Sequence, residues 1–132
     1  MGVEEPMKSR LITAIALLAV SVGAAVFCVL HVNRIARELS GALETAMACA
    51  VTESPGWEDA TREVERLWDK HEGFLHILLP HVNLNELEWA IGALPAYFEQ
   101  RDKALYIEQC VRGLQCVNTV REMERPSWGN IF

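Results

Sequence analysis

The sequence lacks any run of lysine and arginine residues. Its 132 residues include 12 Lys and Arg against 18 Asp and Glu, which gives a formal net charge of −6. Residues 1–32 are neutral in sum, so the negative charge belongs to residues 33–132. An acidic domain without a basic cluster has no electrostatic attraction for nucleic-acid phosphates or for anionic lipid headgroups. We therefore expect no nucleic-acid partner.

The short motifs of catalysis, nucleotide binding and metal binding are also absent. No Gly-x-Ser-x-Gly, phosphate-binding loop or dinucleotide fingerprint occurs, and the four cysteines and four histidines form no Cys-x-x-Cys or His-Glu-x-x-His pair. His71, His76 and His81 are five residues apart, about 140° around a helix, so they do not share a helix face. We expect a protein that is not an enzyme, with no catalytic residue, metal ligand or cofactor.

Charge is missing altogether from Leu11 to Leu30, twenty mostly apolar residues. At about 1.5 Å per residue a helix of this length spans the roughly 30 Å hydrocarbon core of a bilayer. A buried core helix is shorter and carries a polar stripe, and a cleaved signal peptide needs a small-x-small site just after its apolar region, where this chain has His-Val-Asn-Arg. The sequence predicts a short arm at 1–10, a transmembrane helix at 11–32 that contacts the lipid bilayer from Leu11 to Val32, and a domain at 33–132.

The orientation of this anchor does not follow from charge. Lys8 and Arg10 on one side are matched by Arg34 and Arg37 on the other. The short N-terminal arm favours a cytoplasmic N-terminus, which would place the C-terminal domain outside the cytoplasm.

Signals for β-structure are few in residues 33–132, which contain no Asn-Gly or Asp-Gly hairpin turn and no alternating apolar pattern. The apolar residues recur at helical spacing instead. We predict an all-α fold in which the transmembrane helix continues into an antiparallel bundle of about four helices. The apolar stripes expected in that bundle are Ile35-Leu39-Ala42-Ala46-Cys49, Trp57-Thr61-Val64-Trp68-His71-Leu75-Leu78, Leu84-Leu87-Ile91-Leu94-Phe98, and Ala104-Ile107-Val111-Leu114-Val117-Val120 after an Asp102 cap.

Two places in these helices suggest more than packing. His71 lies on the apolar stripe one turn from Trp68, as either a hydrogen-bonded histidine at the edge of the core or a protonation-sensitive joint. Trp89 lies about 160° from the stripe of its helix, beside small side chains such as Ala93. It either packs inside the bundle or meets a protein partner or a second copy of the chain.

Cysteine positions and the C-terminal tail give two further hypotheses. Cys49 and Cys110 fall at similar heights in antiparallel helices, so they are either buried thiols or partners in a disulfide. The tail residues Trp128, Ile131 and Phe132 either meet the membrane surface or a partner, or fold back to cap the core.

Several of these features together resemble a known family. The resemblance rests on the apolar N-terminus, Trp57-Glu58, Trp68, His81 with Leu84-x-Glu86-Leu87, Tyr97, Asp102-Lys103 and the closing Pro126-x-Trp128-x-Asn130-Ile131-Phe132. The chain resembles domain-of-unknown-function family 4363, small membrane proteins of Gram-positive bacteria. This resemblance implies an N-terminus inside the cell, a helical domain outside the cytoplasmic membrane and no established activity or site.

Two functions from different classes remain. The first is a membrane-anchored helical interaction or scaffold module of the bacterial cell envelope, and the second is a small-ligand or pH-sensing bundle around Trp68 and His71. A sealed bundle interior favours the first, and an open cavity near His71 favours the second.

Overall fold

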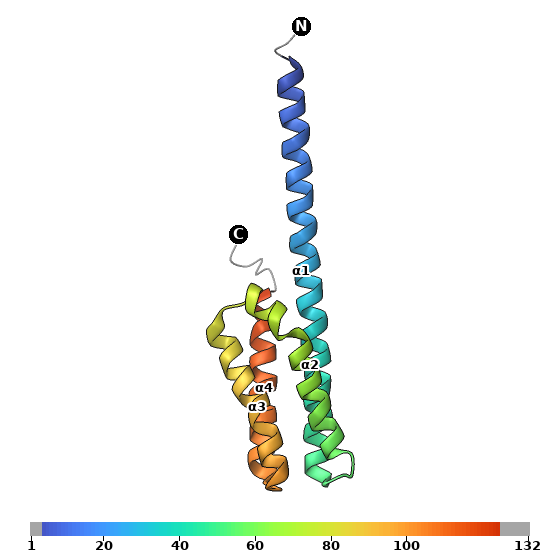
Figure 1. The fold of residues 1–132 in the computed structure, drawn as a ribbon, viewed down its shortest axis with the longest axis vertical. Coiled ribbons are helices and arrows are strands. Elements are labelled where there is room, and N and C mark those ends of the chain that lie inside the picture. The colour runs from blue at the N-terminus through green and yellow to red at the C-terminus, as the bar shows by residue number, and fades with distance from the viewer. Residues whose placement is uncertain (1–3, 125–132) are drawn as a thin grey trace. The chain divides into compact units, whose positions relative to one another are not determined.

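The computed structural model describes residues 4–124 as four α-helices joined by short connections (Figure 1). The helices are α1 (Glu4–Thr52), α2 (Trp57–Leu78), α3 (His81–Glu99) and α4 (Lys103–Glu124). No strand occurs among residues 4–124. The predicted all-α fold is confirmed.

The chain divides into two compact units, Met1–His31 and Val32–Phe132. The first unit contains the apolar stretch of α1, whose large side chains are exposed: Leu11 at 61%, Leu17 at 64% and Val20 at 69%. The second unit contains the rest of α1 with α2, α3 and α4, which pack as a helical bundle.

Within the second unit, consecutive helices run in opposite directions because the connections between them are only two to four residues long. The α1–α2 and α3–α4 turns lie at one end, called here the turn end (Figure 1). At the other end Val32, Leu79 and Val120 line one narrow space of about 10 Å³. This end, where the chain enters the bundle, is called the entry end.

One apolar core joins the four helices of the bundle. The stripe predicted for α2 is confirmed from Trp57 to Leu75. Leu78 is 40% exposed because α2 ends there, and Leu79 is buried in its place. The largest fully buried side chains of the core are Tyr106, Ile35, Leu39, Leu43, Leu84, Leu87, Ile91 and Leu94.

The stripe predicted for α4 is confirmed in part. Val117 and Val120 are buried, and Ile107 and Leu114 are half-buried against the core, but the prediction is wrong at Ala104 and Val111, which are exposed. The buried positions are Tyr106, Cys110, Gly113, Val117 and Val120. These positions follow the same steps of three and four as the predicted stripe, and both faces of the helix carry apolar residues. Periodicity alone therefore could not choose between the two faces.

The start of α4 is capped as predicted. Asp102 accepts a hydrogen bond from the Leu105 N–H at 3.2 Å.

Both turns at the turn end close with the same hydrogen bonds. The Ser54 N–H donates to the Cys49 carbonyl, and the Asp102 N–H donates to the Tyr97 carbonyl, each at 2.9 Å. The residues before these donors, Glu53 and Arg101, have φ of 50° and 56°. This is the Schellman helix ending, in which glycine usually occupies the left-handed position.

Candidate functional site

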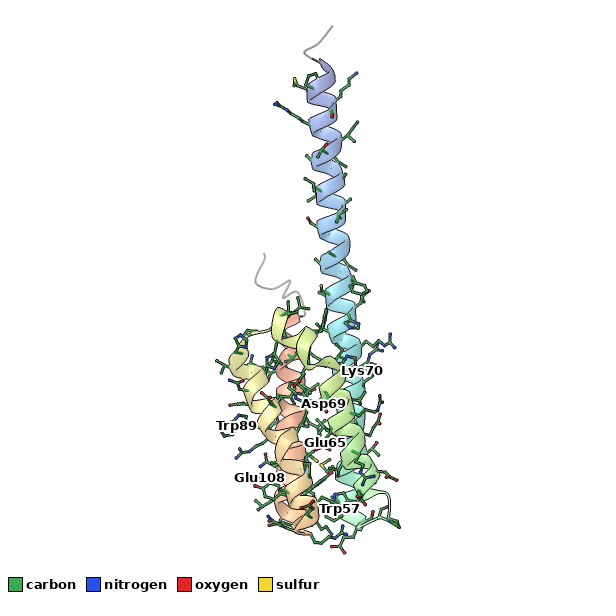
Figure 2. The ribbon with its side chains drawn as sticks, in the orientation of Figure 1. Trp57, Glu65, Asp69, Lys70, Trp89 and Glu108 are labelled. Atoms are coloured by element: carbon green, nitrogen blue, oxygen red, sulfur yellow. The ribbon has the colours of Figure 1, made fainter. Side chains whose placement is uncertain are left out.

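Among the residues of the bundle that the structure describes, Trp89 is a large aromatic side chain left in solvent. Its side chain is 79% exposed on α3 and points away from the bundle (Figure 2). The interpretation that Trp89 packs inside the bundle is therefore wrong. Its role in binding a partner stays a prediction.

A surface groove of about 770 Å³ runs beside Trp89 between α3 and α4. Trp89, Ala90, Ala93 and Tyr97 form its α3 wall. The small side chains of Ala90 and Ala93 lie in this wall next to the indole, as the sequence predicted for Ala93. The volume is comparable to that of binding clefts in proteins.

The α4 wall of the groove is mostly polar and uncharged, with Gln109, Gln115 and Thr119. Arg112 also lines it, and its guanidinium donates a hydrogen bond to Glu108 at 3.3 Å. Amide and hydroxyl groups beside an indole and small apolar side chains suit the mixed surface of a protein partner. Glu86 and Arg112 are the charged side chains among those that line the groove.

The two groove walls are linked by Cys116 of α4 and Glu86 of α3. The Cys116 thiol donates a weak hydrogen bond to the Glu86 carboxylate at 3.8 Å. Burial, the Glu86 charge and this hydrogen bond all raise the pKa of the Cys116 thiol. The thiol therefore stays protonated at neutral pH and is a poor nucleophile.

Trp68 and His71, the predicted sensing pair, are both in the core of the bundle. They are 5% and 8% exposed. The His71 Nε2 lies 3.2 Å from the Glu38 carboxylate on α1, so this histidine is hydrogen-bonded as one interpretation expected. Burial opposes the ionised form of Glu38, but hydrogen bonds from His71 and Arg34 and their positive charges hold its pKa below the usual range.

The cavities nearest this pair do not include it. The narrow space of about 10 Å³ at the entry end is lined by neither Trp68 nor His71. A shallow groove of about 380 Å³ passes Glu38 between α1 and α2, and its lining includes neither Trp68 nor His71. The geometry thus gives His71 a hydrogen-bond partner in Glu38.

Two of the histidines come closer than their spacing suggested. The rings of His76 and His81 are 5.8 Å apart, and the ring of Trp68 contacts His76 at 6.3 Å. The chain reverses at Pro80, so helix geometry does not apply between the two histidines. Within residues 4–124, no group of three or more His, Cys, Asp and Glu side chains is placed to hold a metal ion.

A buried polar pair that the sequence analysis missed joins α2 to α4. The fully buried Tyr106 hydroxyl hydrogen-bonds the Thr61 hydroxyl, which also bonds the Trp57 carbonyl at 2.9 Å. Burial raises the pKa of Tyr106 to about 12. The signal in the sequence was Thr61, whose hydroxyl lies on the predicted apolar stripe of α2. A buried tyrosine needs a hydrogen-bond partner, and such a hydroxyl can supply it.

Residues 26–131 match the family described as Domain of unknown function (DUF4363). The chain belongs to this family. The predicted resemblance is confirmed, and the match covers the whole described bundle of the DUF4363 unit. No curated protein and no solved structure matches the chain.

The remaining predicted residues of this DUF4363 chain are the cysteines and the tail. Cys49 and Cys110 are free thiols here, both near Tyr106, and burial raises the pKa of Cys110 to about 12. A disulfide between them stays a prediction. The candidate interaction residues of the tail, Trp128, Ile131 and Phe132, lie outside the residues that the structure describes.

Proposed function

We propose that this protein is a membrane-anchored, non-enzymatic interaction module of the bacterial cell envelope, with its bundle displayed outside the cytoplasm. The observation that carries the proposal is the exposure of the apolar stretch of α1. This helix is long and apolar enough to cross a membrane, and none of its most hydrophobic window is buried inside the protein. A core helix of a soluble protein would bury that window. Most of residues 11–30 are apolar and exposed, so the stretch needs another apolar environment, and a bilayer supplies it.

The proposed outward orientation rests on the short N-terminal arm and on the family resemblance, because the flanking charges balance. An acidic bundle is compatible with this placement, since long domains cross membranes largely regardless of their charge.

The interaction role rests on Trp89 and the groove between α3 and α4. Tryptophan is enriched among the residues that dominate binding energy at protein interfaces. The alternative, a bundle that senses pH or a small ligand at Trp68 and His71, has support from the His71–Glu38 contact. The groove of about 770 Å³ beside Trp89 supports the interaction module.

Membrane attachment and orientation can be tested together. Carbonate washing of membranes should leave the full chain in the pellet, and release into the wash would contradict the anchor. An impermeant maleimide should label Glu58→Cys in intact cells, because Glu58 is an exposed side chain. The unsubstituted chain is the control for labelling of the native cysteines, and labelling that requires lysis would contradict the orientation.

The interaction role can be tested by crosslinking in membranes. Trp89→Ala should weaken crosslinked partner bands that persist in Leu105→Ala, a control in which another exposed apolar side chain is truncated. Identical band patterns in the two variants would contradict a role for the Trp89 groove.

A further inference from the structure

The end of α2, the α2–α3 connection and the start of α3 form a segment without acidic or strongly basic side chains, which is unusual in this acidic bundle. Residues 73–85 contain no Asp, Glu, Lys or Arg and form the longest such stretch after residues 11–33. We call residues 73–85 the corner. Every other part of the bundle of similar length carries charged side chains.

The corner contains both buried and exposed apolar side chains. Leu75, Leu79 and Leu84 are buried and fix the corner to the core. Ile77 and Val82, by contrast, are 83% and 74% exposed, among the most exposed large apolar side chains of the bundle. The exposed pair therefore lies on a segment whose leucines are buried in the core, and water is a poor environment for the two exposed side chains.

The position of the corner in the bundle limits what it can contact. Leu79 lines the same narrow space as Val32, the first residue of the bundle. Val32 follows the apolar stretch by two residues, since that stretch ends at Leu30. A bilayer that holds residues 11–30 thus ends close in sequence to the end of the bundle where the corner lies.

We propose that the corner is a second membrane contact, with Ile77 and Val82 inserted into the interfacial region of the lipid bilayer. This inference rests on the proposed function, because it needs the apolar stretch to be in the membrane. Aliphatic side chains of a surface segment bind at the boundary of headgroups and acyl chains. The absence of charge matters, because the remaining acidic surface of the bundle is repelled by anionic headgroups and the corner is not.

A bilayer fits the corner better than a second copy of the chain does. Three exposed aliphatic side chains, Ile77, Leu78 and Val82, offer far less than the roughly 800 Å² per partner that a stable protein interface buries. A membrane contact needs no such area because the anchor already holds the bundle at the surface. α2 ends and α3 begins at the corner, and helix ends leave backbone polar groups without partners inside the helix. The hydrated interface of a bilayer can satisfy these groups.

Photocrosslinking of the full chain in phosphatidylcholine vesicles tests the inference. An aliphatic diazirine amino acid replaces Val82, and in separate samples Val51 or Leu17. Val51 is the matched control, because it is also valine and is 51% exposed, but it lies about 28 Å along α1 from Val32, near the turn end. Leu17 reports on the anchor itself. Circular dichroism confirms that each labelled chain is folded.

The expected result is severalfold more lipid adduct at position 82 than at position 51, with adduct at position 17. Adduct at 17 with equally low yields at 82 and 51 would overturn the corner contact and leave the proposed anchor standing. No adduct at 17 would overturn the anchor and the corner contact together. Crosslinking of position 82 to a second chain instead of lipid would also overturn the inference.

Discussion

The hydroxyl of Tyr106 on α4 hydrogen-bonds the hydroxyl of Thr61 on α2, 45 residues earlier in the chain. The ring of Trp57 packs edge-on against Tyr106 with centroids 5.1 Å apart. Tyr106 of α4 thus contacts α2 through both a hydrogen bond and an aromatic ring. This pair makes the core sensitive to ionisation of a single phenol.

Tyr106→Phe should remove part of the loss of stability that the native chain shows at alkaline pH. The pKa of Tyr106 is raised from 10.0 to about 12, so the unfolded chain ionises at lower pH than the folded chain does. The contribution of the neutral Tyr106 phenol to the free energy of unfolding is complete below pH 10 and is lost as the pH rises through 12. It amounts to about 2–3 kcal/mol, at about 1.4 kcal/mol per pKa unit. Urea unfolding of the full chain in detergent between these values measures it, and parallel alkaline slopes in the two proteins would contradict it.

Trp68→Ala and Trp89→Ala should differ strongly in their effect on stability. Trp68 is 5% exposed, and truncation of a buried aromatic side chain costs roughly 3–5 kcal/mol. Trp89 is 79% exposed, so its loss should cost less than about 1 kcal/mol. Denaturant melts of both variants provide the measurement. A large loss in Trp89→Ala would mean that this indole is covered in the protein as it exists in solution.

Glu38→Gln should make the bundle less sensitive to acid. Hydrogen bonds from His71 and Arg34 overcome the effect of burial and lower the pKa of Glu38 from 4.5. This contribution to stability is present above pH 4.5 and is lost as the pH falls through the lower folded-state pKa. Thermal melts at a series of acidic pH values compare Glu38→Gln with Glu44→Gln, an exposed carboxylate of the same helix. If Glu44→Gln changes the acid limb as much as Glu38→Gln does, the prediction is wrong.

Replacing a glycine by alanine should have different effects at Gly73 and Gly113. An added Cβ at Gly73 meets no atom within 4 Å, so Gly73→Ala should stabilise α2 by about 0.5–1 kcal/mol. At Gly113 the added Cβ would lie 3.1 Å from a methyl group of the fully buried Leu43, and crowding should cancel the gain or exceed it. Equal gains in the melting temperatures of the two variants would show that Leu43 moves aside without cost.

The predicted Cys49–Cys110 disulfide can be tested without any substitution. The chain is extracted from membranes, unfolded and alkylated before any reduction, and its peptides are analysed by mass spectrometry. Full alkylation of both peptides would exclude the bond. In the folded chain Cys110 should react much more slowly than Cys49, because its thiol is fully buried and has a pKa of about 12.

The buried face could be predicted for α2 but only in part for α4, for one physical reason. α2 carries its charges on one face, so its apolar stripe has a single solution from Trp57 to Leu75. α4 has apolar residues on both faces, and its buried face includes Tyr106, whose hydroxyl hydrogen-bonds Thr61 on another helix. A pattern within one helix contains no information about that partner.

The candidate site shows the same division. The position of Trp89 off the stripe and its small neighbours could be predicted from helix geometry. The polar wall with Gln109 and Gln115 could not, because it depends on which face of α4 lies beside α3. The His76–His81 contact forms across a chain reversal, where helical periodicity does not hold.

Arg101 has a further consequence for the order in which the bundle opens. Its guanidinium lies over the ring of Phe98 at 4.4 Å and near the ring of Trp57 at 5.7 Å, so the α3–α4 turn is tied to the first residue of α2. This cation–π contact also offsets the strain of a left-handed residue that is not glycine. Amide hydrogen exchange should therefore be slowest in the helix ends next to this turn and fastest at the α2–α3 connection, so that fraying begins at the entry end.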